Sequence, residues 1–160
     1  MLIVPDLCFK ILANMLKAGP QLRKLIDEAA FLVAMDMIVG DSRLLKSYAL
    51  SFLRDFFLYH DPPVSFRIMK KNPDLLDFLL GILDPESRDM ILVTLEILET
   101  LLRLGTGWTS SSDSHQNPVV ATIKGLESAV NMYKVSDLTN NTKALEYQSM
   151  ILEYFDSSRY

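Results

Sequence analysis

The chain has few of the residues that usually carry catalysis or bind metals. Its 160 residues include one cysteine, Cys8, and two histidines, His60 and His115. No spacing among them is typical of a nucleophile–base pair, and Asp113 beside His115 supplies too few ligands for a metal. A glycine-rich phosphate-binding motif is also missing. We therefore expect no enzyme activity, no metal and no cofactor. The single cysteine excludes an internal disulfide and fits a reducing compartment, and we expect it to be buried with a structural role.

Long apolar runs and strand-like alternation are missing as well. No stretch reaches the roughly 18 apolar residues of a membrane-spanning helix, and no segment shows the sustained period-two pattern of strands. The apolar start, residues 1–5, has no basic region and is followed by Asp6 and Lys10, which argues against a signal peptide. Hydrophobic residues nevertheless make up 49% of the chain, enough for a core. The sequence predicts an all-α protein.

The charge pattern argues against nucleic-acid binding. The net charge is −4 and the pI is about 5.1, so there is no basic footprint. Residues 1–60 carry seven basic and six acidic side chains, whereas residues 61–105 carry five and eight. A solvated acidic surface explains the second region most simply, and attraction of a basic partner is the alternative.

Helix-breaking residues recur at a nearly constant interval. Long apolar helix patterns end at Gly19-Pro20, at Asp61-Pro62-Pro63 and at Gly105, so the breakers at 19, 61 and 105 lie 42 and 44 residues apart. This period is typical of armadillo and HEAT repeats, in which each unit buries its apolar face by stacking on its neighbours. We expect a right-handed α-solenoid of about three and a half armadillo repeats, whose function is binding.

Local signals predict a short, a medium and a long helix in each repeat. The predicted helices span 5–18, 21–30, 31–38, 43–58, 64–71, 74–83, 86–104, 118–124, 126–134 and 142–155. The single array 1–160 then divides into 1–18, the last helix of a truncated repeat; repeats 20–59 and 62–105; a polar loop 106–117 that contains Trp108; and a degenerate terminal repeat 118–160. Because the helical pattern starts at once, we expect a fragment of a longer solenoid or an end that needs another cap.

Each long helix keeps a narrow polar stripe on a mostly apolar surface. Spacings of three, four and seven residues put the members of one stripe on one helix face. The stripes are Lys10, Asn14 and Lys17; Ser47, Ser51, Arg54 and Asp55; and Glu96, Glu99, Thr100 and Arg103. Opposite the third stripe, the predicted core residues are Leu92, Leu95, Leu98 and Leu102. Two interpretations stay open: the solvated edge of buried helices, or a concave binding surface.

Three segments carry motifs of a known repeat family. The first is Cys8-Phe-Lys-Ile-Leu-Ala-Asn14 followed by Gly19-Pro20, the second is Val93–Gly105, and the third combines Gly125-Leu126 with Tyr147 and Met150–Phe155. The first looks like an armadillo third helix with its terminal glycine. The other two resemble the penultimate and the short last repeat of the importin-α (karyopherin-α) family. The resemblance spans nearly the whole chain.

This resemblance implies a function in nuclear import. The family binds extended basic peptides, with asparagine amides that clamp the peptide backbone and tryptophan faces that attract lysine side chains. The asparagine positions fall on Asn14, Asp55 and Thr100. The tryptophan positions fall on Lys10, Ser51 and Glu96, none of which is aromatic. The implied protein is an adaptor that shuttles between cytoplasm and nucleus and binds no nucleic acid or membrane. Its implied partners are an importin-β-type receptor, an export receptor, nucleoporins and cargo with a basic signal.

The missing tryptophans shift the expected binding surface toward the C-terminal end. Aromatic residues at a terminal edge often anchor interfaces, and the acidic excess after residue 60 would steer a basic partner. We expect a receptor or nucleoporin to contact Glu99, Arg103, Tyr147 and Tyr154. The alternative function is a generic armadillo or HEAT scaffold unrelated to nuclear transport.

Overall fold

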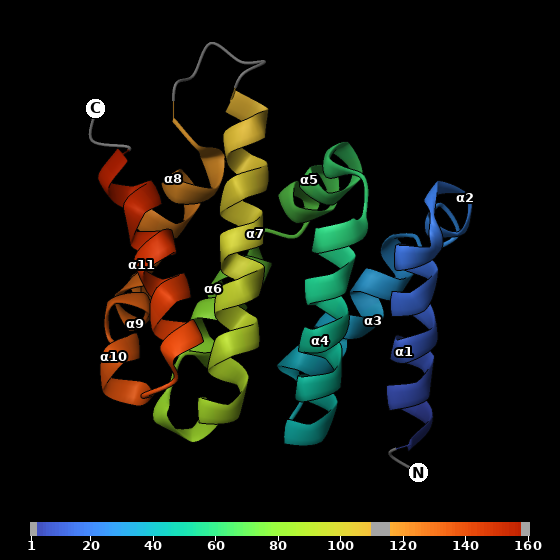
Figure 1. The fold of residues 1–160 in the computed structure, drawn as a ribbon, viewed down its shortest axis with the longest axis horizontal. Helices are drawn as coiled ribbons and strands as arrows, with labels where there is room; N and C mark the ends of the chain where they lie inside the picture. The colour runs from blue at the N-terminus through green and yellow to red at the C-terminus, as the bar shows by residue number, and fades with distance from the viewer. Residues whose placement is uncertain (1–2, 110–115, 158–160) are drawn as a thin grey trace. The chain divides into compact units, whose positions relative to one another are not determined.

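The computed structural model describes residues 3–109 and 116–157, and within these ranges it contains helices and no strands (Figure 1). The all-α prediction is therefore confirmed for this part of the chain. None of these helices is long and apolar enough to cross a membrane. The chain divides into two compact units, residues 1–71 (unit 1) and residues 72–160 (unit 2). The division falls inside the predicted repeat 62–105.

Unit 1 is built on two long helices that lie side by side and run in the same direction (Figure 1). Its helices are α1 (Ile3–Ala18), α2 (Pro20–Arg23), α3 (Glu28–Val39), α4 (Arg43–Tyr59) and α5 (Pro62–Lys71). Both α1 and α3 pack against α4. Aromatic rings fill the core: Phe9 stacks on Phe52 with their centroids 5.0 Å apart, and Phe31 lies 6.0 Å from both Phe56 and Phe57. Such pairs add about 0.5–1.5 kcal/mol each beyond burial.

The connections in unit 1 follow from capping residues. Gly19 adopts a φ of 137°, which suits glycine alone, and Pro20 then begins α2. Asp27 caps α3 by accepting a hydrogen bond from the backbone N–H of Ala29 at 3.0 Å. The predicted boundary between residues 30 and 31 is therefore wrong. The helix begins at the capping aspartate, and no breaker follows it.

His60 ends α4 and is buried. Its Nδ1 accepts a hydrogen bond from the backbone N–H of Asp61 at 2.9 Å, so the proton lies on Nε2. That N–H donates to the carbonyl of Ile26 at 2.9 Å. The imidazole thus fixes the end of α4 to the turn before α3, and its role is structural.

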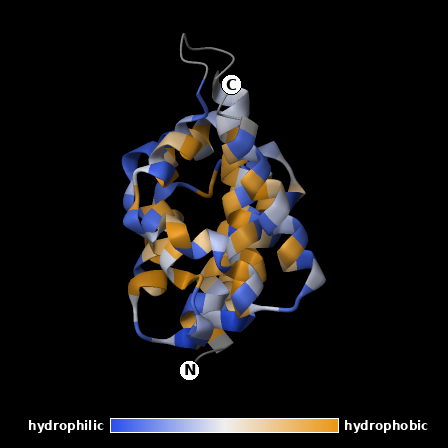
Figure 2. Cartoon of the chain, turned by 90° about the vertical axis from the view of Figure 1, so that its left-hand side faces the viewer, coloured by the Kyte–Doolittle hydropathy of each residue, from blue (hydrophilic) through white to orange (hydrophobic). Residues whose placement is uncertain are grey.

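Unit 2 repeats the pairing of two long parallel helices, here α7 and α11 (Figure 1). Its elements are α6 (Asp74–Ile82), the 3₁₀ helix η1 (Pro85–Met90), α7 (Ile91–Thr109), α8 (Pro118–Lys124), the 3₁₀ helix η2 (Glu127–Ala129), α9 (Val130–Tyr133), α10 (Val135–Leu138) and α11 (Thr142–Ser157). Leu95, Leu98 and Leu102 are buried as predicted, whereas Leu92 is half-buried. Figure 2 shows hydrophobic residues concentrated along these helices and hydrophilic residues at their connections.

Gly105 does not end the third long helix, contrary to the prediction. The helix α7 continues through Gly105 to Thr109, so the predicted polar loop 106–117 starts too early and Trp108 lies on the last turn of α7. A Cβ at Gly105 would collide with the side chain of Asn117. The amide of Asn117 donates to the Leu102 carbonyl at 2.7 Å while its oxygen caps α8. The glycine is therefore required for this close approach, not for termination.

The predicted helix 126–134 is two short elements, η2 and α9, and a third short element, α10, follows it. Amide side chains fix them to the longer helices: Asn131 donates to the Leu80 carbonyl at 3.3 Å, and Gln148 of α11 donates to the Met132 carbonyl at 3.1 Å. The hydroxyl of Ser128 donates to the carboxylate of Asp77. These contacts give the degenerate terminal segment a defined position against α6 and α11.

Candidate protein-binding surfaces

The predicted stripe on α1 is exposed, but its first cation is already paired. Lys10 Nζ lies 2.7 Å from Asp6 Oδ2, one turn earlier on the same helix. The hydrogen bond and the charge of Asp6 raise the pKa of Lys10. Asn14 follows one turn later and is exposed. Of the three predicted asparagine positions, Asn14 alone presents an exposed side chain.

Asp55 does not lie on a solvated stripe, because its side chain is buried beside α1. One carboxylate oxygen is 3.9 Å from Lys17 Nζ and the other is 3.5 Å from Arg54 Nε. Lys17 also lies over the ring of Tyr59, 5.6 Å from its centroid. Ser51 is half-buried on the preceding turn of α4. The stripes of α1 and α4 thus meet at a partly covered charge cluster.

The stripe on α7 is also less accessible than predicted. Thr100 is buried, and its hydroxyl donates to the Glu96 carbonyl of its own helix at 2.8 Å. It therefore offers no free hydroxyl proton to a peptide. Glu99 is 6% exposed, and Glu96 is half-buried. The placement of Thr100 and Glu99 on a solvated face is wrong, since both are covered in the folded unit.

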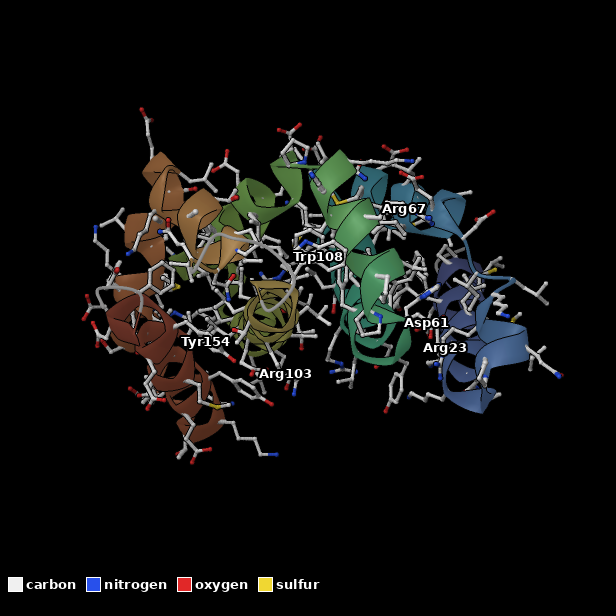
Figure 3. All side chains as sticks on the ribbon, turned by 90° about the horizontal axis from the view of Figure 1, so that it is seen from above. Arg23, Asp61, Arg67, Arg103, Trp108 and Tyr154 are labelled. Atoms are coloured by element: carbon white, nitrogen blue, oxygen red, sulfur yellow. The ribbon has the colours of Figure 1, made fainter. Side chains whose placement is uncertain are left out.

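Glu99 forms the centre of a small polar cluster between α7 and α11. Its Oε2 lies 3.8 Å from Arg103 Nη2, and the Tyr154 hydroxyl donates a hydrogen bond to its carboxylate. Burial is the main cause that raises the pKa of Tyr154, and the negative charge of Glu99 adds to it, while Arg103 opposes it. Figure 3 shows Arg103 and Tyr154 close together at this position. Three of the four predicted partner-binding residues are therefore in one place.

Residues of α11 extend this cluster into a surface. Tyr147, Met150 and Tyr154 are spaced three and four residues apart and so share one helix face. Met150 is exposed, and Tyr147 is half-buried. We call the set Glu99, Arg103, Tyr147, Met150 and Tyr154 the Tyr154 surface. It combines an exposed guanidinium, a buried carboxylate and an adaptable apolar side chain, which are groups suited to protein contacts.

A groove in unit 1 was not anticipated from the sequence. Its volume is about 490 Å³, and its lining includes Ile26, Asp27, His60, Asp61, Arg67 and Ile68. Arg23 forms an ion pair with Asp61 at 3.5 Å, and Arg67 is exposed nearby (Figure 3). Asp27 and Asp61 directly precede α3 and α5, and the first turns of these helices line the groove. These two aspartates were the signal in the sequence that could have indicated it.

Two single residues also differ from expectation, and the metal-site prediction stays open in part. Cys8 is exposed on α1, although a buried structural role was expected. Trp108, which the sequence places in a polar loop, is exposed on α7. The described residues contain no group of three or more histidine, cysteine or carboxylate ligands that could hold a metal. Asp113 and His115 lie outside the described residues.

Comparison of the chain with models of known protein families, with curated proteins and with solved structures finds no match. The candidate surfaces therefore depend on the geometry of the two units.

Proposed function

We propose that this chain is a protein-binding module of armadillo-type repeats and acts as the C-terminal part of an importin-α-like adaptor in nuclear import. The observation that carries the proposal is the recurrence of shorter helical elements followed by one long helix. The order is α2 and α3 before α4, then α5 and α6 before α7, and then α8 and the short elements 127–138 before α11. Parallel pairing of the long helices within each unit supports the same interpretation. Such an adaptor would shuttle between cytoplasm and nucleus.

The Tyr154 surface is the proposed contact with an export receptor, an importin-β-type receptor or a nucleoporin. The guanidinium of Arg103 is exposed while Glu99 beneath it is buried, so the arginine has donors left for a partner. Tyrosine and arginine are the residues that most often dominate binding at interfaces. The position of this surface on α7 and α11 matches the region in which the sequence predicts partner contacts.

Capture of a basic cargo peptide is the weaker part of the adaptor's function in this chain. The peptide would meet Lys10 and Lys17 along α1, which repel lysine side chains. Asp55 and Thr100 are buried, so they are poorly placed to clamp a peptide backbone. Asn14 remains as the one exposed amide among the three asparagine positions.

The second candidate is a generic helical-repeat scaffold. The observation that favours it is the side chain found at each tryptophan position, since Lys10, Ser51 and Glu96 cannot form an aromatic cage for lysine. With this function the chain would still bind proteins, but its partners would not be transport receptors.

Hydrogen-exchange mapping with each transport factor tests both candidates. We expect an export receptor or a nuclear-basket nucleoporin fragment to protect residues 91–109 and 142–157. Arg103→Ala should abolish this protection, whereas Lys143→Ala, at an exposed position of α11, should leave it unchanged. Protection confined to residues before 60, or none with any transport factor, would favour the generic scaffold.

A further inference from the structure

The groove in unit 1 combines apolar side chains with charged ones. The buried side chains of Ile26 and Ile68 and the half-buried side chain of Val64 supply its apolar surface. Its volume of about 490 Å³ lies within the range of roughly 300–1,000 Å³ that is typical of ligand sites. The lining comes from the turn before α3, the first turn of α3, the turn before α5 and α5 itself. The groove is therefore complete within one compact unit.

Each carboxylate in the lining of the groove already has a partner. Asp27 accepts a backbone N–H of the first turn of α3 at 3.0 Å. Glu28 Oε2 lies 3.5 Å from Lys71 Nζ. Asp61 Oδ1 lies 3.5 Å from Arg23 Nη1. A cationic ligand would therefore compete with contacts that the folded unit already makes.

Two cations in the lining have no such partner. Lys24 and Arg67 are exposed, and no carboxylate within residues 3–109 and 116–157 forms an ion pair with either of them. Figure 3 shows Arg67 apart from the paired side chains of Arg23 and Asp61. The groove and the residues paired with it carry four cations and three carboxylates, a net charge of +1: Arg23, Lys24, Arg67 and Lys71 against Asp27, Glu28 and Asp61. The unmatched charge is thus positive.

We propose that this groove binds an acidic peptide segment of a partner protein. The segment carries two carboxylates separated by two apolar side chains. One carboxylate pairs with the guanidinium of Arg67 and the other with the ammonium of Lys24, while the apolar side chains contact Ile26 and Ile68. Arginine suits this role because its donors form a planar fork that matches a carboxylate. The inference does not depend on the proposed function in nuclear transport, in which the cargo signal is basic.

The described part of a second copy of this chain does not offer such a segment. Carboxylates separated by two apolar residues occur at 74–77, 96–99 and 153–156, and all three segments lie within helices. Their buried apolar residues are Leu75, Leu76, Ile97, Leu98 and Phe155. Insertion of any of these segments into the groove would require its helix to unfold. The ligand is therefore assigned to another protein.

Methyl NMR of the full chain, labelled at the isoleucine δ1 carbons, tests the proposal. The probe is an acetylated hexapeptide amide with the order glycine, glutamate, leucine, leucine, glutamate, glycine. We expect the signals of Ile26 and Ile68 to shift and saturate, because both residues line the groove. The signal of Ile97, in the core of unit 2, should stay in place. Arg67→Gln and Lys24→Gln should each raise the Kd roughly three- to tenfold.

Two controls separate charge recognition from other effects. Lys70→Gln removes an exposed cation of α5 that is outside the lining, so the Kd should be unchanged. A peptide with glutamine in place of both glutamates should bind about tenfold more weakly or not at all. Equal binding of the two peptides, or an equal effect of Lys70→Gln and Arg67→Gln, would overturn the proposal.

The remaining outcomes concern what fills the groove. If Ile26 and Ile68 do not shift up to the solubility limit of the peptide, the groove is not open to a partner and the proposal is wrong. Another segment of the same chain in the groove would give this result. Dilution of the free chain should leave both signals in place. A concentration-dependent shift that Arg67→Gln removes would overturn the proposal and assign the groove to a second copy.

Discussion

Each pair of long helices holds one buried carboxylate, and the two carboxylates have different neighbours. In unit 1, Asp55 is held between two cations, Lys17 and Arg54. In unit 2, Glu99 is held by one cation, Arg103, and by the neutral hydroxyl of Tyr154. The first carboxylate therefore lies between two cations, whereas the second has one cation and one neutral hydroxyl. The same helix pairing thus surrounds a buried carboxylate with different groups.

Core truncation should give the largest effect, and it can be compared between the two units. Leu50 in unit 1 and Leu98 in unit 2 are both fully buried. Leu50→Ala and Leu98→Ala should each lower the free energy of unfolding by roughly 2–5 kcal/mol, because each leaves a cavity. Leu32→Ala, at an exposed position, is the matched control and should cost under about 1 kcal/mol. Urea titration measures all three, and equal losses for Leu98 and Leu32 would contradict the assigned core.

Removal of the carboxylate of Glu99 should lower the free energy of unfolding more than removal of the carboxylate of Asp55. Glu99→Ala leaves the Tyr154 hydroxyl without its acceptor and Arg103 without its counter-ion, so we expect a loss of about 1–3 kcal/mol. Asp55→Ala should cost under about 1 kcal/mol, because Lys17 and Arg54 reach solvent and can be hydrated after the substitution, whereas Glu99→Ala also leaves a hydroxyl without its acceptor. Urea titration of both variants provides the comparison. A larger loss for Asp55→Ala would reverse the ranking of the clusters.

The Tyr154 cluster should also respond to alkaline pH. The raised pKa of Tyr154 means that folding favours its protonated form. Its contribution to stability is present below the unfolded pKa of about 10 and is lost as the pH rises through the higher folded pKa. Thermal melts between neutral pH and pH 11 should show a smaller alkaline decrease for Tyr154→Phe than for wild type. Tyr133→Phe, at an exposed position, should follow the wild-type curve.

Peptide binding along unit 1 should be the smallest effect. A lysine-rich localisation peptide should bind the unmodified chain more weakly than about 10 μM, because Lys10 and Ser51 replace the aromatic cage. Lys10→Trp with Ser51→Trp should tighten binding if Asn14 still contacts the peptide backbone, and adding Asn14→Ala should reverse the gain. Calorimetry measures each step. Binding at about 1 μM or tighter by the unmodified chain would contradict this interpretation.

Sequence reasoning succeeded where local chemistry decides the outcome. The starts of α4 and α8 follow from Ser42 and Pro118, whose capping or backbone preferences act within one helical turn. The predicted start of α5 at residue 64 is two residues late, because Pro62 begins the helix and does not only end the previous one. Gly105 misled the prediction, because its role depends on Asn117, twelve residues later in the chain. A glycine alone does not reveal whether it ends a helix or admits a neighbour.

The spacing of the stripe residues could not predict which of them are buried. The spacing places Asp55 on one face of α4 with its stripe, and Glu99 and Thr100 on one face of α7 with theirs. It does not show which neighbouring helix covers each face. In the folded units α1 covers the side of α4 that holds Asp55, and Tyr154 of α11 reaches Glu99. Cys8 shows the reverse error, since an apolar stripe predicts burial only where a neighbour is present. Site accessibility thus required the tertiary structure.

Asn117 has a further consequence for how the chain between α7 and α8 can vary. Its amide binds the Leu102 carbonyl and the Thr106 hydroxyl, at 2.7 and 3.0 Å, and its oxygen caps α8. Both ends of the connection are thereby clamped in place by one side chain. The cost of lengthening such a connection grows slowly with its length. An insertion in the connection between α7 and α8 should therefore leave the register of both helices unchanged.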